Sequence, residues 1–585
     1  MTKKDLDLAA VRARLAQRRG KEYWRSLEEL ARSEVFRDLL RDQFPRQAAW
    51  LDGLDRREFL KLMGASLALA GLSACSPAPA PSNEKIVPYV RQPEEIVPGK
   101  PLFFATAFTL GGIASGLLVE SHEGRPTKIE GNPSHPASLG STDALAQASI
   151  LTLYDPDRSQ VVNNAGRIST WNAFLTAFNT ELEGERLSGG AGLRLLTETV
   201  TSPTLANQLG QWLRKFPKAR WHQYEPVNRE NARAGARLAF GEDVNTYYRF
   251  DRAEVVLSLD SDFLFRGPGS VRYARDFSAR RRIDGGRSEM NRLHAVEASP
   301  SVTGAMADHR LALRPSEIPV LARSIAAALG VFNGQPPKSQ PNKWIDTAVR
   351  DLQRHRGASV IIAGDEQPAE VHALVHAMNH ALDNVGKTVV YTDPIEASPS
   401  DQTSSLRSLV QDMEAGQVKI LVIVGGNPVF TAPADLRFAE RLAGVALRVH
   451  LSLYDDETSA LCHWHIPETH YLESWSDARA YDGTVTILQP LIAPLYAGKS
   501  AHELLGVLTG QPGLSSYDAV RSYWKQQHRS LDFERFWRTA VHDGVVAGTA
   551  FPPKTVRLVS NFEFRASGAE PPKKPETTGP KPETL

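Results

Sequence analysis

The sequence predicts an α/β protein of several interleaved domains, built on two Rossmann-like lobes with parallel sheets and with a small β-rich region before them. Three apolar runs of strand length, residues 255–259, 360–363 and 420–424, are separated by helix-like stretches, a pattern typical of parallel βαβ units. Each run ends in a turn rich in Asp, Gly or Asn. The chain has 585 residues, too many for one simple core, and its hydrophobic content of 42% is that of an ordinary globular protein.

The chain begins with a segment of helical pattern. Apolar side chains recur at helical spacing between Tyr23 and Leu40, with charged residues between them. Residues 1–54 are therefore expected to form a helical extension of a leader peptide, of the kind found in a variant twin-arginine family. An ordinary amphipathic helix is the alternative.

An export signal is indicated at residues 55–75. Arg56 and Arg57 lie in a segment that resembles the twin-arginine export motif, and an apolar run at residues 62–72 follows. The run is shorter than the ~20 apolar residues that cross a membrane, and it has the length of the apolar part of a signal peptide. It ends at Cys75 in what looks like a lipobox, so Cys75 is the expected lipidation site. The alternative is a buried apolar helix with a chance Arg-Arg pair.

A Pro-rich segment and a small β-rich domain come next. Residues 76–100 predict a stiff, extended tether. Two apolar stretches, residues 117–121 and 126–130, are separated by a hairpin-like break, which predicts a β-rich domain over residues 101–165. The stretch that ends at Pro136 resembles a motif of the molybdopterin oxidoreductase family. It reads Gly-Arg-Pro-Thr-Lys-Ile-Glu-Gly-Asn-Pro-Ser-His-Pro. The resemblance implies a molybdopterin oxidoreductase-like fold in which this domain is a degenerate iron–sulfur cluster domain.

The same resemblance indicates what the chain has lost. Active family members place their last cluster cysteine after this motif and, two residues later, a lysine that relays electrons between cluster and pterin. Asp143 and Leu145 stand at those positions here. The only cysteines are Cys75 and Cys462, whereas an iron–sulfur cluster normally takes four thiolates. Cys462 also lies too late in the chain to bind molybdenum, so the resemblance implies no catalytic residue and no cofactor in this chain.

The strand-end turns are candidate ligand contacts. In open α/β sheets ligands lie beyond the carboxyl ends of strands, where Gly and Asn permit close approach to phosphate. In the molybdopterin family such turns hold the nucleotide tails of the cofactor. We interpret the turns here as vestigial and retained for packing, because the cluster is missing. Their residues are Asp260, Asp262, Gly425, Gly426 and Asn427.

Three histidines are weak candidates for metal ligands. His463, His465 and His470 lie near the thiol of Cys462, and both groups have suitable ligand chemistry. His463 and His465 alternate along a predicted strand and so face away from Cys462. A loop at Pro467 could bring His470 back to them. Histidines of the core or of an interface are the favoured interpretation.

The remaining boundaries follow from the alternation of strand and helix patterns. We expect the first Rossmann-like lobe at residues 166–345 and the second at residues 346–510. Residues 511–568 predict a helical or irregular segment. Residues 569–585 are rich in Pro, Lys, Thr and Glu and predict a disordered tail.

Taken over roughly residues 20–560, the chain resembles the molybdopterin-free half of the large iron–sulfur subunit of alternative complex III. This implies a non-catalytic structural subunit of a quinol oxidoreductase, lipid-anchored on the periplasmic side of the bacterial inner membrane. The implied partners are a ferredoxin-like iron–sulfur subunit, an integral membrane quinol-binding subunit and cytochrome c-type subunits. Those partners would hold the iron–sulfur clusters and the haem.

Two other functions remain open from the sequence. One is an active bis-molybdopterin oxidoreductase, and the other is a free-standing lipoprotein that binds a nucleotide-like ligand. Nucleic acid is not an indicated partner, because the net charge is +1 and no basic stripe with interleaved aromatic residues is present.

Overall fold

The computed structural model describes residues 97, 99–283, 289–331, 342–528 and 532–559. By its contacts the chain divides into residues 1–93 and 94–585, and every described residue belongs to the second unit. The expected leader, the signal with Arg56, Arg57 and Cys75, most of the tether and the tail at residues 569–585 lie outside the described residues. Within the described part, no helix has the length and apolar character needed to span a bilayer.

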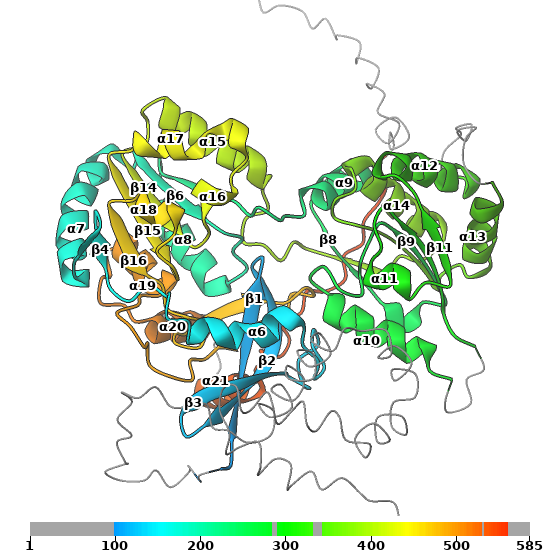
Figure 1. The fold of residues 1–585 in the computed structure, drawn as a ribbon, viewed down its shortest axis with the longest axis horizontal. Helices are drawn as coiled ribbons and strands as arrows, with labels where there is room; N and C mark the ends of the chain where they lie inside the picture. The colour runs from blue at the N-terminus through cyan, green and yellow to red at the C-terminus, as the bar shows by residue number, and fades with distance from the viewer. Residues whose placement is uncertain (1–96, 98, 284–288, 332–341, 529–531, 560–585) are drawn as a thin grey trace, which may run out of the picture. The chain divides into compact units, whose positions relative to one another are not determined.

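An antiparallel three-stranded sheet opens the described chain (Figure 1). Its strands are β1 (Leu102–Leu110), β2 (Ile113–His122) and β3 (Arg125–Gly131). The hairpin between β2 and β3 turns at Glu123 and Gly124, both with positive φ, as a tight two-residue turn requires. Helix α6 (Ala144–Leu153) packs on this sheet through Ala146 and Leu153. The predicted β-rich segment is present.

The larger parallel sheet has seven strands in the order β5-β4-β16-β15-β14-β6-β7. Five strands pair in parallel, and the short β4 and β5 extend one edge through antiparallel pairing. The bounds are β4 (Asn163–Asn164), β5 (Arg167–Ile168), β6 (Leu193–Thr197), β7 (Arg220–Gln223), β14 (Ile420–Val424), β15 (Leu447–Ser452) and β16 (Trp464–Pro467).

Helices cover both faces of the seven-stranded sheet because its central strands are apolar on both sides. Leu195 and Val422 face one core cluster, and their neighbours Leu196 and Leu421 face another. The first cluster is covered by α7 (Trp171–Ser188), α8 (Pro203–Lys215) and α19 (Ala501–Thr509). The second is covered by α15 (Gln402–Glu414) and α17 (Phe438–Ala443).

The second parallel sheet has four strands in the order β11-β10-β9-β12. Its strands are β9 (Val255–Leu259), β10 (Arg292–Glu297), β11 (His309–Ala312) and β12 (Ser359–Ala363). One face packs on α9 (Glu230–Phe240), α12 (Ile318–Ala328), α13 (Asn342–Arg354) and α14 (Ala369–Ala381), and the other on α10 (Ser270–Arg281). A separate antiparallel pair joins β8 (Asn245–Tyr248) to β13 (Val389–Thr392).

The two lobes are interleaved in sequence, so the expected boundary between residues 345 and 346 is wrong. The seven-stranded sheet takes strands from residues 163–223 and again from 420–467, and Ile420 pairs directly with Leu193. The four-stranded sheet lies between them in the chain. The alternation of strands and helices locates each strand, but it does not specify which strands pair across a long connection.

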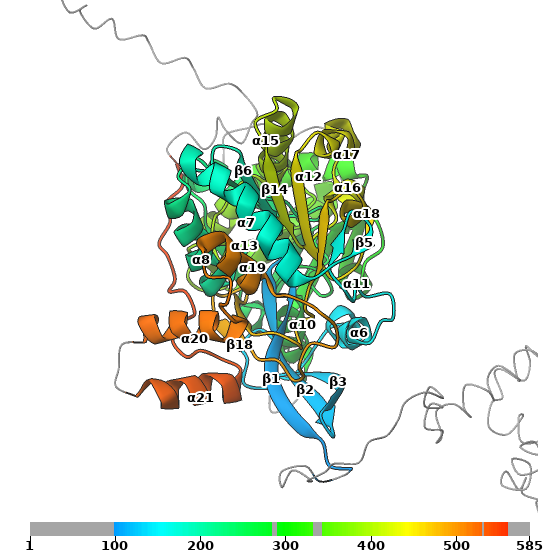
Figure 2. The same ribbon diagram turned by 90° about the vertical axis from the view of Figure 1, so that its left-hand side faces the viewer.

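The segment that follows the lobes is helical in part, as expected. A hairpin of β17 (Ser476–Arg479) and β18 (Val485–Leu488) precedes α20 (Ser516–Gln527) and α21 (Phe533–Asp543). The two helices lie side by side (Figure 2) and share an apolar cluster that includes Trp524 and Trp537. The described chain then returns to the four-stranded lobe, where Val556 is buried.

Candidate ligand cleft at the carboxyl end of the seven-stranded sheet

The turn after β14 is formed by two glycines and an asparagine. Gly425 and Gly426 have φ values of 69° and 65°, a backbone conformation that side chains strongly disfavour. The amide nitrogen of Asn427 donates to Glu457 Oε2 at 2.6 Å, and its Oδ1 accepts from Thr458 Oγ1 at 2.7 Å. Asn427 therefore ties the turn to α18 (Glu457–Ala460).

A small cavity of about 150 Å³ lies beside this turn, at the ends of β6, β7 and β14. Glu198 and Glu225 line it together with Tyr224 and the Gly425–Asn427 turn. No lysine or arginine is among its described lining residues. The cavity is therefore acidic and lies where open α/β sheets usually bind ligands.

Three carboxyl groups influence one another here although they lie far apart in sequence. Burial, followed by the nearby charge of Glu198, raises the pKa of Glu225 to about 8. The same two causes raise the pKa of Glu468, which follows β16, to about 8. Solvent reaches the side chain of Glu198, but the protein packed around it also raises its pKa. The group therefore retains protons near neutral pH, and sequence analysis missed it because none of the three belongs to a motif.

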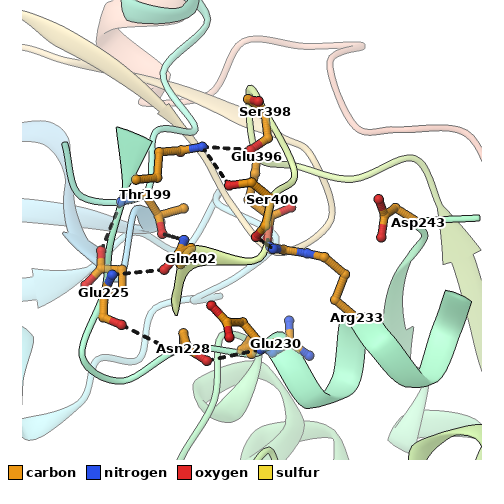
Figure 3. A network of polar contacts seen from close by, with 12 residues as sticks. Thr199, Glu225, Asn228, Glu230, Arg233, Asp243, Glu396, Ser398, Ser400 and Gln402 are labelled. Carbon is orange, nitrogen blue, oxygen red and sulfur yellow. Dashed lines mark hydrogen bonds and ion pairs between the residues drawn. The ribbon is translucent and has the colours of Figure 1, made fainter. Parts of the chain in front are cut away.

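A polar network joins the cavity to the segments that connect the lobes. Figure 3 shows Gln402 between Thr199 and Glu225: its Nε2 donates to Thr199 Oγ1 at 2.7 Å, and its Oε1 accepts from the Glu225 backbone N–H at 2.9 Å. Glu225 Oε1 in turn accepts from the Thr199 backbone N–H at 3.1 Å. Arg233 of α9 pairs with Glu396 of the second connecting segment at 2.8 Å. These contacts hold the segments that connect the two lobes in place beside the carboxyl groups.

The corresponding turns of the four-stranded sheet are arranged differently. Asp260 has a φ of 56°, and its carboxylate accepts from the Ala298 backbone N–H at 2.9 Å and from Gln367 Nε2 at 3.0 Å. Asp262 Oδ1 accepts from the Thr303 backbone N–H at 2.9 Å. Both carboxylates therefore fasten neighbouring loops.

The three histidines proposed as weak metal ligands make separate contacts. His463 Nδ1 accepts from the Arg448 backbone N–H at 3.1 Å, and His470 Nε2 lies 3.0 Å from Thr152 Oγ1. His465 is buried between two serine hydroxyls. Among the described residues, no group of three or more His, Cys, Asp or Glu side chains is placed to hold a metal ion.

The residues at the expected cluster position have other roles. Asp143 caps α6, accepting from the Ala146 backbone N–H at 2.7 Å. Leu145 is 57% exposed on the same helix. Burial raises the pKa of the Cys462 thiol to about 12, so this cysteine is a poor source of thiolate. This donor set does not fit an iron–sulfur cluster.

A nucleotide-bearing pterin also does not fit the residues at the glycine turn. A Cβ atom on Gly425 would lie 2.5 Å from Glu198 Oε2, so the carboxylate already occupies the space that the glycine leaves open. Phosphate sites use cationic side chains or free N–H groups, whereas this cavity presents carboxyl groups.

Comparisons with known proteins agree with the sequence motifs. No family model matches the chain. The menaquinone reductase molybdopterin-binding-like subunit of Nitratidesulfovibrio vulgaris is 22% identical over 575 residues, covering 88% of this chain and 79% of that protein. Among solved structures, acetylene hydratase from Pelobacter acetylenicus superposes with a TM-score of 0.54 at 12% identity, covering 70% of this chain and 69% of the other. This chain therefore has a molybdopterin oxidoreductase-like fold.

Proposed function

We propose that this chain is a non-catalytic, structural subunit of a membrane-bound quinone oxidoreductase complex. The relative in N. vulgaris is named as a subunit of a menaquinone reductase and aligns over most of the chain, which supports membership of such a complex. That name refers to quinone reduction, whereas the resemblance to alternative complex III implies quinol oxidation. The proposal therefore covers quinone chemistry in either direction.

The non-catalytic role rests on one observation. The position of the cluster cysteine holds Asp143, which is used as a helix cap, and the position of the relay lysine holds the apolar Leu145. One carboxylate cannot replace the four thiolates that a cluster normally takes, and a leucine cannot act as a cationic relay. Without a cluster to deliver electrons, a molybdenum centre in this chain would be isolated.

We assign the iron–sulfur partner to the surface around α6 and α10. Leu145, Leu151 and Phe265 are 57%, 71% and 57% exposed. A groove of about 650 Å³ runs between the start of α6 and α10, and its charged lining residues are Arg275, Arg282 and Asp143, so cations outnumber carboxylates there. Exposed apolar side chains beside cations suit a partner whose own apolar patch is edged by carboxylates.

The localisation proposal is based on the sequence alone. Export through Arg56 and Arg57 and lipid attachment at Cys75 would place the chain on the periplasmic side of the inner membrane. One lipid chain holds a protein only marginally, so contacts with membrane subunits would add to the anchor. The intact mass of the native chain tests this: an unmodified Cys75, or a mature N-terminus elsewhere, contradicts it.

Elemental analysis of the purified chain tests the non-catalytic role. We expect neither molybdenum nor iron in stoichiometric amount, because the donor set fits neither group. About one molybdenum per chain would instead support the active bis-molybdopterin enzyme. A native chain recovered without partner subunits would support the free-standing lipoprotein.

A matched pair of variants tests the docking surface. Leu145→Asp places a charge on the exposed face of α6, and we expect at least a tenfold loss of the co-purifying iron–sulfur subunit. Leu187→Asp is the control, because Leu187 is 95% exposed at the end of α7, away from the groove. Equal recovery of the partner with both variants would contradict this assignment.

A further inference from the structure

We propose that Glu198 is a built-in occupant of the glycine turn and excludes the phosphate groups of nucleotides from the carboxyl end of the seven-stranded sheet. Glu198 directly follows β6, and its side chain extends to the turn after β14. This inference goes beyond the proposed function, because it concerns binding by the chain alone and does not depend on a complex.

The space beside the turn is already filled. A Cβ on Gly425 would lie 2.5 Å from Glu198 Oε2, and one on Gly426 would lie 3.4 Å from Glu198 Cγ. The side chain therefore lies along both glycines. The remaining cavity of about 150 Å³ is smaller than the roughly 300–1,000 Å³ of ordinary ligand sites.

Several backbone donors that could receive a phosphate are also used or missing. Pro428, the first residue of α16 (Pro428–Thr431), has no N–H. The Val429 N–H donates to Thr458 Oγ1 at 3.0 Å, and the Gly425 N–H donates to Leu451 O at 2.8 Å. The turn thus has the shape of a phosphate cradle but lacks much of its donor set.

The charged groups around the cavity also disfavour the binding of phosphate. Glu225 lines the cavity with Glu198, and Glu468 lies close enough for its pKa to respond to Glu198. No described lysine or arginine lines the cavity to offset a diphosphate. Where these carboxyl groups ionise, the phosphate of a ligand would meet their negative charge, which disfavours binding. Glu198 supplies bulk at any pH, and it supplies negative charge once it has lost its proton.

Titration calorimetry on the full-length chain, with GDP and inorganic pyrophosphate as probes, tests the inference. Glu198→Ala removes bulk and charge, and we expect it to bind GDP at least tenfold more tightly than the unmodified chain. Glu198→Gln removes the charge but keeps the bulk, so its affinity should fall between the two. Glu366→Ala, an equal change of charge in the loop after β12 of the other sheet, should leave GDP binding unchanged.

Two results would overturn the inference. One is GDP binding by the unmodified chain as tight as that of Glu198→Ala, and the other is no gain in either Glu198 variant. Thermal unfolding of each variant shows whether it is folded, and if Glu198→Ala is not, the nearly isosteric Glu198→Gln carries the test alone. Neither result changes the expected metal content or complex composition, so failure here is distinct from failure of the proposed function.

Discussion

At the carboxyl end of the four-stranded sheet, Asp260 and Asp262 direct their carboxylates into neighbouring loops and accept backbone or amide hydrogens. At the carboxyl end of the seven-stranded sheet, Glu198 lies against Gly425 and Gly426, and no described residue donates a hydrogen bond to its carboxylate. Acidic residues thus follow an interior strand of both sheets. In the four-stranded sheet their carboxylates hold neighbouring loops, and in the seven-stranded sheet the carboxylate of Glu198 occupies space beside two glycines.

The difference separates a stabilising carboxylate from one that is not needed for stability. A carboxylate that accepts two hydrogen bonds stabilises the folded chain, because its removal leaves buried donors without partners. A carboxylate crowded by other carboxyl groups costs free energy of folding as it ionises. Substitution of Glu198 itself should therefore reveal function rather than loss of stability.

The largest expected effect concerns Asp260, whose carboxylate accepts two hydrogen bonds. Asp260→Ala removes the acceptor of two hydrogen bonds and places alanine at a φ of 56°. We expect a loss of about 3 kcal/mol, measured as a shift in urea-induced unfolding. Asp260→Asn keeps an acceptor and tolerates this backbone conformation, so it should lose less than half as much. Equal losses would show that the two hydrogen bonds do not stabilise the fold.

The next effect tests the contact between Glu198 and the glycine turn. Gly425→Ala adds a Cβ 2.5 Å from Glu198 Oε2 at a φ of 69°, and we expect a loss of about 1–2 kcal/mol, most of it backbone strain because the flexible end of Glu198 can move aside. In a Glu198→Ala background no side chain has to move, so the loss should be smaller by about 0.5 kcal/mol. A double-mutant cycle measures the difference. Additive losses would mean that Glu198 does not press on the turn.

The pH dependence of stability gives a smaller effect. The pKa of Glu225 is raised from 4.5 to about 8, so between these values the folded chain holds a proton that the unfolded chain has released. Stability from this group is complete below pH 4.5 and is lost as pH rises towards 8. Glu225→Gln keeps an acceptor for the Thr199 N–H and should flatten this loss, on the order of 1–2 kcal/mol. Melting temperatures at pH 5 and pH 8 measure it, and parallel curves for both proteins would contradict it.

The smallest expected effect concerns Asp262, at the carboxyl end of the four-stranded sheet. Asp262→Asn retains an oxygen that can accept from the Thr303 N–H, so stability should change by less than about 0.5 kcal/mol. Asp262→Ala, the control, should lose about 1 kcal/mol because that N–H loses its partner. If the asparagine variant loses as much as the alanine variant, the charge of Asp262 matters as well as its hydrogen bond.

The sequence by itself determined the local features of this protein. The strands ending at Leu259, Ala363 and Val424, the hairpin at Glu123 and the turn at Gly425 follow from side-chain periodicity and from glycine, which act over a few residues. The prediction that Asp143 and Leu145 stand in place of a cluster cysteine and a relay lysine also came from the sequence, because those positions are counted from a contiguous motif.

Only the tertiary structure decided which distant segments meet. Ile420 pairs with Leu193, so the lobe boundary expected near residue 345 was wrong. The charge of Glu198 acts on Glu468 although the two follow different strands, and Asp260 accepts hydrogen bonds from loops that come later in the chain. The physical reason is that strand pairing depends on closing long connections and burying two faces of a sheet, and local periodicity is the same for every pairing that satisfies those conditions.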